Sequence, residues 1–256
     1  MRILILFRLY PNIYLSPHPG KVYEVKRLLS RTKFTGREAV LDFGCGSGLL
    51  TFIIGTKCNS VTGLDINEAG IQNARRKAEL LRGRINVKFH CGPIEDADLK
   101  EESFDKVFSF CVIEHVSNYE EVLRILYRIL KPGGELMFSV DTLASITDPI
   151  IIEKHRQTCM IEQYFKEDAL RALLETTGFC DIEIHPLLVS EYAKRQWTDR
   201  VTSGNFGYWF PRTFLGYLKM KYCEAQAKSA QAGLFLEIKC RKPSHLPSGR
   251  GKPNCD

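Results

Sequence analysis

This sequence of 256 residues lacks a long apolar run and a long tract of Lys and Arg. A helix that crosses a bilayer needs about 18 consecutive apolar residues, whereas the N-terminus offers only the short apolar run at residues 3–7. That run is also too short for the apolar part of a signal peptide. The sequence therefore predicts no membrane-spanning segment and no appended RNA-binding module, and it leaves peripheral contact with a membrane surface open.

Cys-x-x-Cys pairs are also absent, although the chain has nine cysteines. Their number is odd and they are scattered, so a disulfide framework is not expected. Two of them, Cys111 and Cys240, fall in predicted buried strands, where a free thiol packs as a small apolar group. These features predict a reducing, cytoplasmic location without structural disulfides.

Basic residues outnumber acidic residues only slightly in the whole chain. The formal net charge is +6, and the basic residues are spread along the sequence. A solvated surface is the favoured explanation of this mild excess, with an anionic partner as the alternative. Hydrophobic residues make up 44% and charged residues 26%, as in ordinary globular proteins. The length suits one domain with a sizeable core and an elaboration.

A glycine-rich stretch at residues 39–48 organises the chain. Its first half is apolar and β-prone, which predicts a short buried strand over residues 40–43. Three glycines follow at alternate positions: Gly44, Gly46 and Gly48. Glycine lets the backbone turn tightly and approach a ligand, and the helix predicted over residues 47–55 offers free N–H groups to an anion. Strand, turn and helix together predict a cofactor-binding loop, with an ordinary strand-to-helix turn as the alternative.

An acidic residue, Asp65, ends the second predicted strand, over residues 60–65. In a doubly wound fold such a carboxylate lies beside the bound ligand and accepts hydrogen bonds from ribose hydroxyls. Further segments alternate in the same way: strands over 85–90, 104–111, 135–140, 181–185 and 233–240, and helices over 22–29, 67–82, 118–130 and 166–177. This alternation predicts an α/β fold, with a mainly parallel sheet covered by helices on both faces.

Four segments in this order resemble the motifs of class I S-adenosylmethionine-dependent methyltransferases: LDFGCGSG, VTGLDIN, SFDKVFSFCVIEHV and LKPGGELMFSV. The resemblance is close over residues 36–140 and looser to about residue 184. It implies a Rossmann-like, doubly wound sheet of seven strands, mostly parallel, whose last strand is antiparallel. It also implies that the chain binds S-adenosyl-L-methionine, releases S-adenosyl-L-homocysteine and methylates a small molecule, most simply at a hydroxyl oxygen.

Each part of this cofactor needs a different protein group. Backbone N–H groups of the glycine loop suit its carboxylate, Asp42 suits its ammonium group, and Asp65 suits the ribose diol. Ile66 is expected to pack on the adenine. The resemblance implies a further adenine contact from residues 91–96, where Pro93 replaces the usual aspartate. The expected cofactor-binding residues are Asp42, Gly44, Cys45, Gly46, Gly48, Asp65, Ile66, Ile94, Glu95 and Cys111.

Glu114 and His115 follow the fourth predicted strand and are the candidate catalytic residues, because ligands bind at the carboxyl ends of strands in open α/β sheets. His115 is the candidate general base for a hydroxyl acceptor. The alternatives are that it caps the next helix or packs beside the cofactor, while positioning supplies most of the acceleration. Related methyltransferases with Glu-x-x-Glu-His at this place bind a divalent metal. Cys111 replaces the first glutamate here, so no metal is expected.

Two segments do not fit the simple alternation of strands and helices. Residues 141–165 are expected to form an insertion over the ligand face, with a short helix near residues 150–158. Residues 186–232 are rich in aromatic and basic side chains, which favours a substrate lid. A dimer or membrane surface and a satellite core are the alternatives. The expected substrate-binding residues are Tyr14, His18, Trp197, Tyr208 and Trp209.

The expected domain organisation follows from these segments: an N-terminal cap at 1–35, a cofactor-binding core at 36–185, a lid at 186–232, the last core strand at 233–240 and a disordered tail at 241–256. Alternatives to O-methylation of a small molecule are C- or N-methylation, RNA methylation and cofactor binding without catalysis. Nucleic acid is not the expected partner, and both a monomer and a homodimer are left open.

Overall fold

The computed structural model describes residues 18–204, 212–227 and 232–244. Three residues on the list of expected substrate contacts, Tyr14, Tyr208 and Trp209, lie outside these described residues. Most of the expected N-terminal cap and of the expected tail lies outside them as well.

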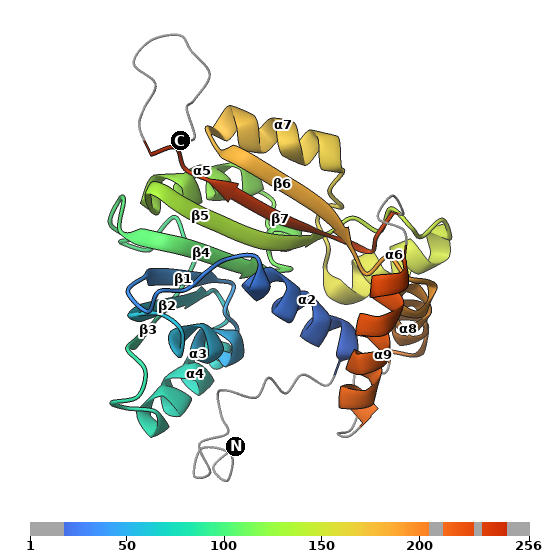
Figure 1. The fold of residues 1–256 in the computed structure, drawn as a ribbon, viewed down its shortest axis with the longest axis horizontal. Coiled ribbons are helices and arrows are strands. Elements are labelled where there is room, and N and C mark those ends of the chain that lie inside the picture. The colour runs from blue at the N-terminus through green and yellow to red at the C-terminus, as the bar shows by residue number, and fades with distance from the viewer. Residues whose placement is uncertain (1–17, 205–211, 228–231, 245–256) are drawn as a thin grey trace.

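A seven-stranded sheet forms the centre of the molecule, with the strand order β3-β2-β1-β4-β5-β7-β6 (Figure 1). The strands are β1 (Ala39–Phe43), β2 (Ser60–Asp65), β3 (Val87–Cys91), β4 (Phe104–Phe110), β5 (Leu130–Asp141), β6 (Cys180–Leu187) and β7 (Phe235–Arg241). The five strands β1 to β5 pair in parallel. Strand β7 inserts between β5 and β6 and is antiparallel to both. The predicted Rossmann-like fold, with its antiparallel last strand, is confirmed.

Helices cover both faces of this sheet (Figure 1). They are α2 (Pro19–Ser30), α3 (Leu49–Gly55), α4 (Glu68–Leu80), the single turn η1 (Ile113–His115), α5 (Tyr119–Ile129), α6 (Pro149–Cys159), α7 (Glu167–Thr177), α8 (Glu191–Ser203) and α9 (Arg212–Gln226). Neighbouring residues of one strand pack on opposite faces of the sheet. Phe138 packs in the cluster under α5 and α7, whereas Met137 packs in the cluster under α2 and α3. This alternation buries the central strands on both sides.

Local sequence signals set several of the helix ends. The side chain of Asn67 accepts a hydrogen bond from the backbone N–H of Gly70 at 2.9 Å, so Asn67 caps α4. Gly178 ends α7 in the left-handed region, with a φ of 106°. Helix α5 ends at Ile129, shortly before Pro132 and two glycines.

Two expectations need correction. The fifth strand was expected at residues 135–140, but β5 begins at Leu130. Backbone bonds explain the extension, since Gly133 N–H donates to Lys242 at 2.9 Å and Lys242 N–H donates to Gly134 at 2.9 Å. The expectation of a chain without disulfides is wrong at Cys180, which is disulfide-bonded. Seven other described cysteines are free: Cys45, Cys58, Cys91, Cys111, Cys159, Cys223 and Cys240.

The aromatic-rich segment builds a second apolar cluster beside the main core. Trp197 and Val201 of α8 and Met220 of α9 are buried there with residues from the ends of the central strands. The satellite-core explanation accounts for these side chains, while the expected division into cap, core and lid stays a prediction. In the part of the chain that the structure describes, every helix is too short or too polar to cross a membrane.

Candidate active site

The glycine loop follows β1 at the carboxyl edge of the sheet. The N–H groups of Gly44 and Cys45 donate to the carbonyl of Leu64, at 2.8 and 3.1 Å, which fixes the loop against β2. Gly44, Gly46 and Gly48 have φ angles of 74°, 53° and 76°. A Cβ on Gly44 would lie 2.2 Å from a methyl carbon of Val112. Both the backbone conformation and the packing therefore require glycine at position 44.

Asp65 lies against this loop, as the sequence predicts. One carboxylate oxygen accepts the N–H of Gly46 at 2.6 Å, and the other accepts the N–H of Asn67 at 2.8 Å. The next residue, Ile66, is 75% exposed and presents a bare apolar side chain beside the acid. An acid for a ribose diol and an apolar surface for a purine thus lie side by side at the tip of β2. The loop, the acid and the exposed isoleucine fit the nucleoside and amino-acid parts of S-adenosylmethionine.

Asp42 lies on β1 just before the loop and is fully buried. Its carboxylate accepts the hydroxyl hydrogen of Thr51, on α3, at 2.6 Å. Burial raises the pKa of Asp42 to about 7, against the opposing effect of that hydrogen bond. A nearby ammonium group would stabilise the ionised form of this buried carboxyl group. This agrees with the role expected for Asp42, which is to bind the ammonium group of the cofactor.

Three further expected cofactor residues have other neighbours in the structure. Ile94 is only 2% exposed and packs in the main core. The carboxylate of Glu95 accepts a hydrogen bond from the amide of Asn118 at 2.5 Å. Cys45 is buried at the loop, and burial raises the pKa of its thiol beyond the usual range. The adenine contacts of Ile94 and Glu95 stay predictions.

A cavity of about 270 Å³ opens at the carboxyl ends of β4 and β5. Segments far apart in the sequence form its wall: α2, the end of β4 with η1, the end of β5, α6, α8 and the start of β7. Its lining residues are His18, Lys21, Glu24, Cys111, Glu114, His115, Asp141, His155, Cys159, Ile161, Trp197, Arg200, Val201 and Phe235. Val112, which would touch a Cβ on Gly44, directly follows Cys111 of the wall. The cavity and the glycine loop are therefore neighbours.

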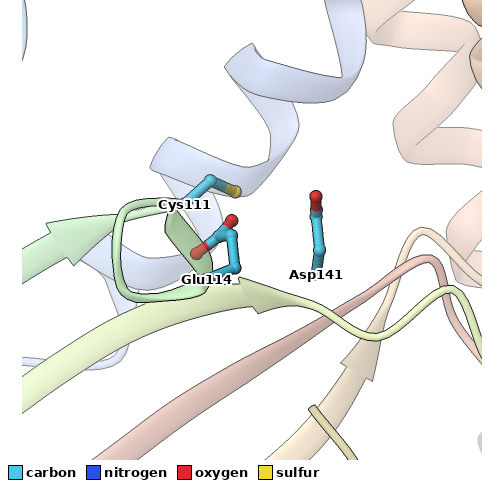
Figure 2. Close-up of side chains that lie close together, drawn as sticks. All are labelled: Cys111, Glu114 and Asp141. Atoms are coloured by element: carbon cyan, nitrogen blue, oxygen red, sulfur yellow. The ribbon is translucent and has the colours of Figure 1, made fainter. Parts of the chain in front are cut away.

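Two buried carboxyl groups and a thiol meet on one side of the cavity (Figure 2). The ligand atoms of Cys111, Glu114 and Asp141 all lie within 4.8 Å of one another. Glu114 is fully buried, and neither of its carboxyl oxygens has a hydrogen-bond partner among the residues that the structure describes. Burial raises the pKa of Glu114 well above its usual range, and repulsion from Asp141 adds to the rise. Such a group favours a bound proton or cation.

Asp141 is the member of this group that is not among the site residues expected from the sequence. It ends β5, and burial raises its pKa to about 7, with repulsion from Glu24 as the next cause. The rule that pointed to Glu114, proximity to the carboxyl end of a central strand, applies equally to Asp141. Within the described part of the chain, Cys111, Glu114 and Asp141 form a group that can hold a divalent cation, so the expectation of no metal stays a prediction.

His115 lies on the exposed side of the same cavity. Its Nδ1 is 3.2 Å from the carbonyl oxygen of Met160. Because a carbonyl oxygen can only accept, a neutral His115 carries its hydrogen on Nδ1 and keeps the lone pair of Nε2 free. Such an arrangement suits a general base.

The N-terminal helix α2 contributes an unexpected charged pair to the cavity. The ammonium group of Lys21 donates to Glu24 at 2.9 Å and to the carbonyl of Phe110 at 3.1 Å. Glu24, which is 1% exposed, also accepts the hydroxyl hydrogen of Ser139 at 2.5 Å. The two residues are three apart in the sequence, so they share one face of a helix. That spacing was visible, but the docking of α2 against β4 and β5 was not.

Two of the expected substrate-binding residues do line the cavity. His18 is buried and accepts the N–H of Lys21 at 3.3 Å, which caps α2. Burial lowers the pKa of His18 to about 3, so it is neutral. Trp197 is also buried, and its ring centroid lies 4.8 Å from that of His155. Burial lowers the pKa of His155 to about 4, so this residue too is neutral beside Asp141.

Comparison with known proteins agrees with the class that this fold and loop define, a Rossmann-like methyltransferase. The sequence model of the family described as "Methyltransferase domain" matches residues 35–178. The match covers more than half of the chain, so the chain belongs to this family, the class I S-adenosylmethionine-dependent methyltransferases.

Two curated relatives illustrate the range of the family. The arsenite methyltransferase of Mus musculus is 36% identical over 156 residues, which are 55% of this chain and 41% of that protein. The mitochondrial ubiquinone biosynthesis O-methyltransferase of Mus musculus is 32% identical over 174 residues, 64% of this chain and 44% of that protein. This chain thus spans less than half the length of these relatives.

Solved structures support the fold alone. Phosphoethanolamine N-methyltransferase 2 of Haemonchus contortus, solved with S-adenosyl-L-methionine, has a TM-score of 0.62 at 17% identity; the match covers 87% of this chain and 52% of that one. The YcgJ protein of Bacillus subtilis has a TM-score of 0.62 at 14% identity; the match covers 87% of this chain and 99% of that one.

Proposed function

We propose that this chain transfers the methyl group of S-adenosyl-L-methionine to a small molecule held in the 270 Å³ cavity, with a hydroxyl oxygen as the accepting atom. The observation that carries the proposal is the position of His115. Its Nδ1 lies 3.2 Å from the carbonyl oxygen of Met160, which leaves Nε2 to accept a proton, and the residue lines a cavity that adjoins the glycine loop. The mitochondrial ubiquinone biosynthesis O-methyltransferase of mouse, named for transfer to oxygen, is among the relatives.

The residues at the carboxyl edge of the sheet have different roles in this reaction. The glycine loop binds the carboxylate of the cofactor, Asp65 binds its ribose hydroxyls, and Ile66 packs on its purine. When bound, S-adenosylmethionine supplies an electrophilic methyl group on a sulfonium. His115 takes the hydroxyl hydrogen of the acceptor, which raises the nucleophilicity of the oxygen. Enclosure of the acceptor by Trp197 and its neighbours holds that oxygen in place and excludes water.

Arsenite is the second candidate acceptor. Two thiols, Cys111 and Cys159, lie on the wall of the same cavity. Trivalent arsenic forms bonds to sulfur. For each As–S bond that forms, a hydroxyl group of arsenite and the hydrogen of the thiol leave together as water. The arsenite methyltransferases of mouse, rat and human are 34–36% identical over the matched residues. Cysteine supplies the ligand atom that soft metals prefer.

A labelling experiment separates the two acceptors. Wild-type protein is incubated with methyl-labelled S-adenosylmethionine and either a panel of hydroxylated aromatic compounds or arsenite. Hydroxyl transfer predicts a labelled ether whose rate of formation is unchanged in Cys159→Ser. Arsenite transfer predicts labelled methylarsenic that is lost in Cys159→Ser and kept in Cys223→Ser, a thiol on α9 outside the cavity lining. If the protein bound the cofactor but transferred no label to any hydroxylated compound, the assignment of oxygen as the accepting atom would be wrong.

The cytoplasmic location stays a prediction as well. Free thiols at seven described cysteines support it. The disulfide at Cys180 counts against it, so cell fractionation with thiol trapping is the measurement that decides.

A further inference from the structure

A second, larger hollow opens at the opposite edge of the sheet from the glycine loop. Its volume is about 630 Å³, and it is lined by the connection between α2 and β1, the starts of β4 and β5 and the end of β7. We call it the basic groove. Its charged lining consists of seven basic and three acidic residues: Arg31, Lys33, Arg37, Lys106, Lys131, Lys239, Arg241, Glu38, Asp105 and Glu135.

Glu135 is the acid of the basic groove that contacts several cations at once. Lys106 forms an ion pair with it, Lys239 lies 3.0 Å from it and Arg241 lies 3.4 Å from it. Burial alone would raise the pKa of Glu135, but hydrogen bonds from Lys106, Thr32 and Lys239 lower it to about 2. Arg241 also lies 3.9 Å from Asp181, an acid outside the groove lining. Lys106 and Lys239 therefore share one carboxylate, and one positive charge remains uncompensated there.

The other two acids are committed elsewhere in the groove. Asp105 pairs with Lys131 at 2.7 Å and also accepts the N–H of Ala39 at 2.8 Å. One oxygen of Glu38 accepts the N–H and hydroxyl hydrogens of Thr35 at 2.6 and 2.8 Å. These contacts hold both carboxylates close to the backbone at the rim.

Two basic side chains at the rim have no acidic partner among the described residues. Lys33 and Arg37 are exposed, and neither forms an ion pair with a described acid. Arg31 differs, because it reaches Glu237 at 3.3 Å, outside the groove lining. With Arg31 and Arg241 set aside, because each also pairs with an acid outside the groove lining, five basic residues face three acids, an excess of two positive charges.

We propose that the basic groove binds a small anion that carries at least two phosphate groups. A single phosphate would reach only part of the groove, whereas a chain of phosphates can contact the excess charge near Glu135 and the rim cations Lys33 and Arg37 together. Arginine presents a planar fork that matches phosphate oxygens, and lysine adds a point charge. The volume of about 630 Å³ lies within the range of small-molecule sites. The groove is separate from the cofactor loop, so both sites can be filled at once.

Calorimetric titration with sodium tripolyphosphate tests this assignment. The wild type is expected to bind one tripolyphosphate per chain, with an affinity that weakens as salt is added. The Lys33→Ala/Arg37→Ala double variant is expected to bind about tenfold or more weakly. Lys57→Ala/Arg76→Ala removes the same charge from two exposed positions outside the groove lining and is expected to bind as the wild type does. Binding of S-adenosylmethionine is expected to be equal in all three proteins.

Three results would overturn the proposal. They are the absence of binding heat with tripolyphosphate at low salt, equal weakening in both double variants, and binding of a 20-nucleotide RNA by a protein that does not bind tripolyphosphate. Lys33 and Arg37 are exposed and unpaired, so neither substitution is expected to lower the midpoint of thermal unfolding.

Discussion

The His115→Gln variant is expected to lower the rate of methyl transfer to a hydroxyl acceptor by about 10²- to 10⁴-fold, the usual contribution of a positioned general base. Glutamine can still donate to the carbonyl of Met160, 3.2 Å from Nδ1 in the wild type. It cannot take a proton. The affinity for S-adenosylmethionine is expected to stay unchanged, because His115 belongs to the acceptor side of the cavity.

Two control variants make this prediction specific. His185→Gln alters an exposed histidine on β6, outside the cavity lining, and is expected to leave the rate unchanged. Asp141→Asn tests the other group that can take a proton, because burial brings the pKa of Asp141 to about 7. If Asp141→Asn lost the rate and its dependence on pH while His115→Gln kept both, Asp141 would be the base and the assignment of His115 would be wrong.

The Gly44→Ala variant is expected to lose about 2–5 kcal/mol of unfolding free energy, measured by urea denaturation. Two costs add. A side chain at a φ of 74° costs about 1–2 kcal/mol, and the new Cβ would lie 2.2 Å from Val112, an overlap that costs about 1–3 kcal/mol to relieve. The same displacement of Val112 is expected to disturb the cavity wall at Cys111.

Gly36→Ala is the matched control for this variant. Gly36 has a φ of 81°, but a Cβ there would meet nothing within 4 Å. It is expected to show the conformational cost alone. Adding Val112→Ala to Gly44→Ala is expected to recover the part of the loss that comes from the overlap. Equal losses for the two glycines, or no recovery in the double variant, would show that packing against Val112 does not dictate glycine at position 44.

Local patterns in the sequence were sufficient to predict the glycine loop and the acid that lies against it. The spacing of the three glycines, the acid that ends β2 and the cap at Asn67 each depend on a few consecutive residues. Their geometry follows from rules of strand ends and turns, so the structure could be anticipated there. The number of strands and the antiparallel β7 were anticipated through the family resemblance.

The acceptor side depends on contacts that no local pattern encodes. Glu24 comes from α2 and Asp141 from β5, more than a hundred residues apart, yet both face one cavity. Their meeting depends on how α2 docks across β4 and β5. The long β5 was missed for a similar reason, because its first residues are held by Lys242 from the far end of the chain. Such long-range pairings become visible only in the fold.

The measurement that tests the central claim most directly is a calorimetric titration of the protein with S-adenosylmethionine, repeated with Asp65→Ala. The wild type is expected to bind one molecule per chain. Loss of two charge-assisted hydrogen bonds to the ribose, worth about 1.5 kcal/mol each, is expected to weaken binding about 100-fold in Asp65→Ala. Asp168→Ala, an exposed acid on α7, is expected to bind as the wild type does. Absence of binding by the wild type, or equal affinity in Asp65→Ala, would contradict a cofactor site at the glycine loop.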